Sequence, residues 1–117
     1  MNQKIPLDIS PEELNQWILD DFSRLILVDV RETEELTMAP FSYQVLHLPL
    51  SRFLAWSQTF RENLPVEKKI VVLCHSGVRS WNFGVWLLEQ DFRYLVWNLK
   101  GGIDAWSQSV DDSVPRY

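Results

Sequence analysis

Residues 70–80 are Ile70-Val71-Val72-Leu73-Cys74-His75-Ser76-Gly77-Val78-Arg79-Ser80. The first four are apolar and three of them are β-branched, which predicts a buried strand. A short polar loop with one glycine begins at Cys74, the only cysteine of the chain, and a helical pattern starts at Ser80. Such a loop directs backbone N–H groups and the positive end of a helix at one point, where negative charge is favoured. The stretch therefore predicts a cysteine held as the thiolate, its reactive form.

Strands and helices are predicted to alternate along the rest of the chain. Apolar runs rich in β-branched residues predict further strands at residues 25–30, 45–48 and 95–99. Ser10-Pro11-Glu12-Glu13 is typical of a helix start, because it combines a cap, a proline at the first helical position and a capping box. Further helices are expected at residues 51–63, 80–90 and 103–107, a short helix or loop at 31–36, and a loose tail from residue 110.

This alternation predicts an α/β fold. We expect a mostly parallel sheet of about five strands with helices on both faces, in a single domain that spans residues 1–117. Ligands of such folds bind beyond the carboxyl ends of the strands. Cys74 lies at one such end, and Asp29 and Arg31 lie at or just past another, so one site is expected at this edge.

Composition excludes several classes of function. The net charge is -5 and Lys68-Lys69 is the only basic pair, so we expect no nucleic-acid partner. No apolar run is long enough to cross a bilayer, and residues 1–6 lack the apolar segment of a signal peptide. One cysteine with two histidines is a poor metal set and cannot form an internal disulfide. We therefore expect no metal, no cofactor, no membrane association and a reducing, cytoplasmic location.

The loop at residues 74–80 resembles the active-site loop of the rhodanese family, whose single-domain members show C-x-x-G-x-R-S. Other stretches are similar to the family's elements in the same order along the chain. They are the opening helix at residues 9–14, the D-V-R-E signature at 27–32, the strand-to-helix step at 48–53 and the G-G-x-x-A-W element at 99–106. The segment at residues 38–44 departs from the family's G-H-I-P-G-A, and in the family this segment lies near the rim of the pocket.

The resemblance implies a sulfurtransferase of the rhodanese-like fold. Cys74 would take the outer sulfur of a donor such as thiosulfate as a persulfide, and a thiol, cyanide or a protein acceptor would then remove it. The persulfide would be held by backbone N–H groups of the loop residues, which are His75, Ser76, Gly77, Val78, Arg79 and Ser80.

Individual side chains receive expected roles in this scheme. Gly77 lets the backbone curl, and Arg79 supplies positive charge to an anionic donor and to the thiolate. Ser80 is expected to cap the following helix, and Arg31 to add positive charge at the mouth. Asp29 is expected to be structural, accepting backbone N–H bonds and pairing with a basic residue.

Several of these residues also have a simpler interpretation. Cys74 would then be a small hydrophobic residue of the core, and Arg79 would be a solvated residue at a helix start. The ring of His75 is expected at the loop rim, although a role in tuning the thiol or selecting substrate is open. His47 is expected to be a satisfied histidine on its strand, and the glutamates at 32, 34 and 35 to be a solvated face.

Two other functions compete with sulfur transfer. Cysteine phosphatases also place a thiolate in a loop closed by arginine, but they put five residues between cysteine and arginine, whereas four intervene here. The smaller loop suits a single sulfur atom better than a phosphoryl group. The second alternative is a binding module or a partner-specific sulfur relay on the same fold, with residues 38–44 as the expected contact.

Overall fold

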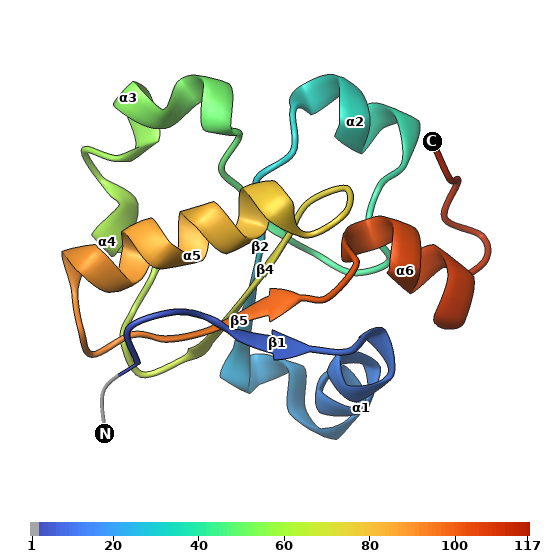
Figure 1. Cartoon of the computed structure of the whole chain (residues 1–117), viewed down its shortest axis with the longest axis horizontal. Helices are drawn as coiled ribbons and strands as arrows, with labels where there is room; N and C mark the ends of the chain where they lie inside the picture. Colours follow the sequence, from blue (N-terminus) through green and yellow to red (C-terminus); the bar gives the residue numbers. More distant parts are fainter. Residues whose placement is uncertain (1–2) are drawn as a thin grey trace.

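The computed structural model describes residues 3–117, and its strands form one five-stranded sheet in the order β1-β5-β4-β2-β3 (Figure 1). Residues 1 and 2, which the expectations for the N-terminal segment and the domain span include, lie outside the described residues. Every strand pair is parallel. The strands are β1 Leu7–Ile9, β2 Leu25–Asp29, β3 Leu46–His47, β4 Lys69–Leu73 and β5 Leu95–Leu99.

Helices cover both faces of the sheet (Figure 1). The α-helices are α1 Pro11–Asp21, α2 Thr33–Met38, α3 Phe53–Trp56, α4 Phe60–Asn63, α5 Val78–Gln90 and α6 Gly102–Ser109. Two short 3-10 helices are η1 Phe22–Arg24 and η2 Leu50–Arg52. The α/β class and the two covered faces are therefore confirmed.

The central strand β4 explains why residues 70–73 are all apolar. Successive side chains of a strand point to opposite faces of the sheet. Ile70 and Val72 join the core beneath α4 and α5, and Val71 and Leu73 join the core beneath α1 and α6. Because both faces are covered, no position in this run contacts solvent, and Cys74 follows it at a fixed place on the carboxyl edge.

Local sequence signals account for the start of α1 and for a glycine inside α5. Ser10 caps α1 and forms the expected capping box with Glu13. Gly84 lies inside α5 where a side chain would clash: an added Cβ would be 2.5 Å from Pro6 and 3.2 Å from Val96 of β5. Gly84 therefore permits the close approach of α5 to the sheet.

The structure corrects several of the expected elements. The three-residue strand β1 at the sheet edge was not predicted, because so short a run carries no periodic signal. The helix expected at residues 51–63 is divided into η2, α3 and α4, and it is interrupted at the polar run 57–59, where serine and threonine favour turns. Helix α5 begins at Val78 and not at Ser80.

The C-terminal tail is packed and not loose. Val114 is buried, and its carbonyl accepts a hydrogen bond from Ser107 of α6 at 2.6 Å. The tail then returns to α2, where Tyr117 bonds to two side chains. The segment at residues 38–44 packs on α6 in the same region: Phe41 lies 4.7 Å from Trp106 between ring centroids. This segment therefore supports the core beside α6.

Candidate active site

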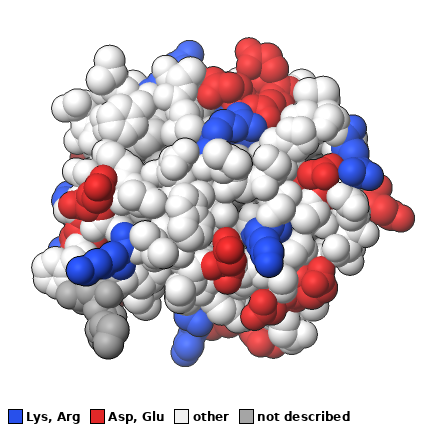
Figure 2. Space-filling view, viewed as in Figure 1, with Lys and Arg blue, Asp and Glu red and all other residues white. Residues whose placement is uncertain are grey.

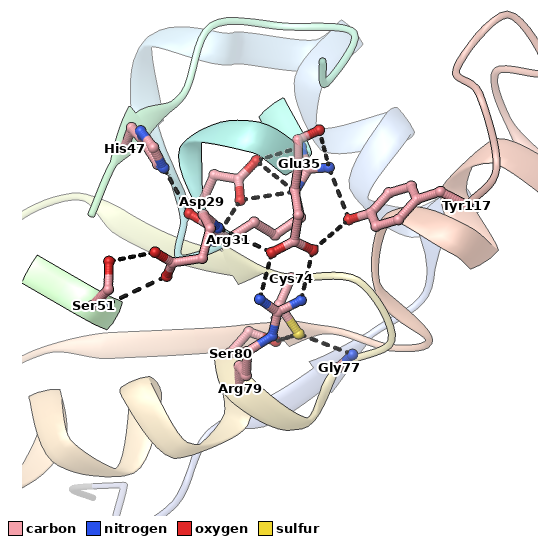
Figure 3. A network of polar contacts seen from close by, with 11 residues as sticks. Asp29, Arg31, Glu35, His47, Ser51, Cys74, Gly77, Arg79, Ser80 and Tyr117 are labelled. Atoms are coloured by element: carbon pink, nitrogen blue, oxygen red, sulfur yellow. Dashed lines mark hydrogen bonds and ion pairs between the residues drawn. The ribbon is translucent and has the colours of Figure 1, made fainter. Parts of the chain in front are cut away.

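The loop after β4 turns its backbone toward the sulfur of Cys74 (Figure 3). The N–H of Gly77 donates to Sγ of Cys74 at 3.1 Å. Gly77 is the N-cap of α5 with φ of 108°, a conformation that side-chain-bearing residues rarely adopt. This backbone conformation is the one expected of Gly77, and it directs the N–H toward the thiol.

Helix α6 holds the loop in place from behind. Its first backbone N–H groups donate to the loop: Ile103 to the carbonyl of Cys74 at 2.9 Å and Asp104 to that of His75 at 3.1 Å. A Cβ at Gly102 would lie 2.3 Å from the His75 carbonyl oxygen, so only glycine permits this approach. The two glycines at 101 and 102 form a turn with positive φ, and the second also lets α6 pack against the cysteine loop.

Ser80 contacts the thiol instead of capping the helix. It lies inside the first turn of α5, where its Oγ is 3.2 Å from Sγ of Cys74 and 2.5 Å from Oδ1 of Asn98. Asn98, from β5, also donates through Nδ2 to the carbonyl of Gly77 at 3.1 Å. Asn98 therefore connects both groups that contact the sulfur. Its only signal in the sequence is that it is a polar residue in an apolar strand.

Arg79 is paired with a carboxylate of α2. Its two terminal nitrogens donate to Glu35 at 2.6 and 2.9 Å. Hydrogen bonds from Arg79 lower the pKa of Glu35 to about 2, against the opposing effect of burial. Hydrogen bonding to Glu35 in turn raises the pKa of Arg79, so both groups are charged throughout the physiological range. The expected solvated face of α2 is therefore wrong at Glu35.

Arg31 does not reach the mouth of the site. Its side chain is 0% exposed and donates to both carboxylate oxygens of Asp29, with Nη2 at 2.8 Å. Asp29 also accepts the backbone N–H of Arg31 at 3.0 Å. Asp29 makes the contacts expected of it, and the expected position of Arg31 at the mouth is wrong because this partner holds it inside. His47 is satisfied on β3, with Nε2 2.6 Å from the Arg31 carbonyl oxygen.

Tyr117 joins the Arg31–Asp29 pair to the Arg79–Glu35 pair. Its hydroxyl accepts from Nη1 of Arg31 at 3.1 Å and donates to Glu35 at 2.8 Å (Figure 3). Its ring stacks on His75 with centroids 4.2 Å apart. His75 is half-buried under this ring, so it lies at the rim without facing solvent freely. No sequence pattern indicates Tyr117, because the tail carries no periodic signal.

The thiol itself lies deep in the loop. Cys74 is 1% exposed, whereas Ser76 and Val78 on the outside of the loop are exposed. The site consists of the free thiol of Cys74, the contacts of Gly77 and Ser80 to its sulfur, and the guanidinium of Arg79 paired with Glu35. Within residues 3–117, no three side chains of the metal-binding types gather to hold a metal ion. No helix in that part of the chain is long and apolar enough to cross a bilayer.

Comparison with known proteins places this fold and loop in one class. The family model of the Rhodanese-like domain matches residues 10–109. The sequence is 38% identical over 113 residues to Rhodanese-like/PpiC domain-containing protein 12, chloroplastic, of Arabidopsis thaliana, covering 94% of this chain and 37% of that protein. It is 31% identical over 104 residues to a sulfurtransferase of Allochromatium vinosum, covering 86% of this chain and 88% of that one.

Solved structures agree with this assignment at the level of the fold. A rhodanese-like domain protein from Staphylococcus aureus superposes with a TM-score of 0.71 at 23% identity, covering 95% of this chain and 98% of that one. The fold and the site therefore define a class of protein: an α/β domain that holds a thiol in a loop after its central strand. The chain belongs to the rhodanese-like domain family.

Proposed function

We propose that this protein is a sulfurtransferase that carries a sulfane sulfur as a persulfide on Cys74. The donor is thiosulfate or a similar sulfane-sulfur compound, and the acceptor is a thiol, cyanide or a protein nucleophile. The observation that carries the proposal is the pair of contacts to the Cys74 sulfur, from the N–H of Gly77 at 3.1 Å and from Ser80 at 3.2 Å. The name of the Allochromatium vinosum relative supports the same reaction class.

The reaction proceeds in two displacements with one cysteine. The Cys74 thiolate attacks the outer sulfur of the donor, so that an Sγ–S bond forms while the donor's S–S bond breaks and its electron pair leaves with the donor. The acceptor then attacks the outer sulfur, and the electron pair of the Sγ–S bond returns to Cys74 as the thiolate. The proposed location is the reducing cytoplasm, where this single free thiol stays unoxidised.

Loop residues divide the work by their contacts. Gly77 donates to the sulfur, and its positive φ keeps that N–H pointing inward. Asn98 fixes both Gly77 and Ser80, so it acts as a positioning residue. His75, Ser76 and the exposed Val78 form the outer rim that donor and acceptor meet first.

An intact mass spectrum of the purified protein tests the proposal. Incubation with thiosulfate or glutathione persulfide should add one sulfur atom, and cyanide should remove it. The Cys74→Ser variant should gain none and keep the wild-type circular dichroism spectrum. Retained sulfur transfer in a folded Cys74→Ser protein would disprove the mechanism. A phosphatase is tested in parallel: hydrolysis of p-nitrophenyl phosphate that disappears in Cys74→Ser would replace the sulfurtransferase with that alternative.

A further inference from the structure

The cations around Cys74 are matched by carboxylates. Arg79, the cation within electrostatic reach of the thiol, makes two hydrogen bonds to Glu35, and the pair is only partly exposed, at 36% and 17% of the two side chains. Arg31 is fully buried on Asp29. Figure 3 shows the Glu35 carboxylate between the guanidinium of Arg79 and the hydroxyl of Tyr117.

The same balance holds farther from the thiol. Asp104 lies in the first turn of α6, next to the cysteine loop, and is paired with Arg116 at 2.8 Å. Lys100 lines the groove on the other side of the loop, and Asp8 lines that groove too. Figure 2 shows acidic side chains gathered over α2, the helix that carries Glu35. The approach to Cys74 is therefore not a positively charged funnel.

This arrangement opposes a donor with an anionic head group. Thiosulfate carries two negative charges, largely on its sulfonate oxygens, and binding them in a partly desolvated site requires uncompensated positive charge. Here a sulfonate that approached Arg79 would also meet the ionised carboxylate of Glu35. A donor whose sulfur is attached to an organic thiol brings no such head group, and the exposed side chain of Val78 offers an apolar surface at the rim.

We propose that Glu35, held by Tyr117, is a specificity-determining residue that neutralises Arg79 and so directs the site toward organic hydropersulfide donors and away from thiosulfate. The inference rests on the proposed function and narrows its donor. In the step it implies, the Cys74 thiolate attacks the outer sulfur of R–S–SH. The Sγ–S bond forms, the donor's S–S bond breaks, and the group R–S leaves as the thiolate while the proton stays on the transferred sulfur.

The test compares two single variants, each of which removes one negative charge from α2. Glu35→Gln keeps the shape of the side chain and frees Arg79, whereas Glu34→Gln removes the same charge from an exposed position of the same helix. Each protein reacts with iodoacetate and with iodoacetamide, which differ by one negative charge. We expect the rate ratio of iodoacetate to iodoacetamide at Cys74 to rise roughly tenfold in Glu35→Gln and to stay at the wild-type value in Glu34→Gln.

Donor preference is the second readout. Wild-type protein should have a higher kcat/KM for glutathione persulfide than for thiosulfate, and Glu35→Gln should raise kcat/KM for thiosulfate by roughly tenfold. The inference is overturned if Glu35→Gln changes neither the alkylation ratio nor the thiosulfate kcat/KM. If that variant does not fold, the wild-type protein alone tests the inference. A rate ratio of iodoacetate to iodoacetamide at Cys74 that is roughly tenfold above the ratio for free glutathione would overturn it.

Failure of the proposed function gives a different result. Alkylation measures the charge at Cys74 without any sulfur transfer. If neither donor adds sulfur to the wild-type protein while the alkylation ratio rises in Glu35→Gln, the charge assignment stands and the sulfurtransferase proposal is overturned.

Discussion

Two arginine–carboxylate pairs lie at the same edge of the sheet. They have the same chemistry but differ in exposure and in the elements that they join. Arg31 and Asp29 belong to the end of β2 and are both 0% exposed. Arg79 and Glu35 join α5 to α2 and remain partly exposed beside the thiol. Both pairs are bidentate, so geometry alone does not separate them.

Burial separates their roles. A fully buried ion pair is costly to form and still more costly to break, because removal of one partner leaves an uncompensated charge in the interior. A partly exposed pair contributes little to stability, and its charges act on whatever approaches it. We therefore expect the buried pair to fix the strand end and the partly exposed pair to set the electrostatics of the site.

Removal of Asp29 should have the largest effect on stability. Asp29→Ala strands the Arg31 guanidinium in the interior and removes the acceptor of its backbone N–H, so the free energy of unfolding should fall by about 3–5 kcal/mol. Urea denaturation followed by tryptophan fluorescence measures the loss.

A surface pair gives the matched comparison. Arg116→Ala breaks the exposed contact with Asp104 and should leave the urea midpoint almost unchanged. The double variant Asp29→Ala/Arg31→Met should recover part of the loss, because no charge is then left unpaired. A wild-type midpoint for Asp29→Ala would contradict the structural role of the buried pair.

Removal of Arg79 should affect chemistry more than stability. In Arg79→Ala the carboxylate of Glu35 is uncompensated near Cys74, so it opposes the thiolate, and loading by glutathione persulfide should slow roughly tenfold. The free energy of unfolding should change by at most about 1 kcal/mol, since solvent screens this pair.

The double variant Arg79→Ala/Glu35→Gln identifies the cause of that slowing. It should regain most of the wild-type loading rate, because the opposing charge is gone. If it stays as slow as Arg79→Ala, the arginine acts on the donor directly and its neutralisation by Glu35 is not what matters.

The two pairs also mark how far the sequence predicts this site. The apolar run before Cys74, the glycine at 77 and the alternating elements predicted the fold and the loop, because these signals are local. The contacts of Asp29 could be expected from the sequence, since its partner Arg31 is two residues away. Arg31 was wrongly placed at the mouth, because the direction of its side chain depends on that same contact.

Contacts between residues far apart in the chain could not be predicted from the sequence patterns. Glu35 lies 44 residues from Arg79 along the chain, and Tyr117 lies 82 residues from Glu35. Glu35 was grouped with its solvated neighbours, and the tail that carries Tyr117 was expected to be loose. Only the parallel sheet and the return of the tail bring these residues to one place.

The smallest effect expected is the response of the exposed pair to acid. The pKa of Glu35 is lowered from 4.5 to about 2, chiefly by hydrogen bonds from Arg79. A depressed carboxyl pKa stabilises the folded state above the unfolded value and loses that contribution as pH falls through the folded value. The difference in unfolding free energy between wild type and Glu35→Gln should therefore be constant above pH 4.5 and shrink between pH 4.5 and about 2. Urea denaturation of both proteins across this range measures it, and other carboxylates cancel in the difference. A difference that shrinks only above pH 4.5 would show that Glu35 is not held ionised by Arg79, and the contrast between the two pairs would then lose its electrostatic basis.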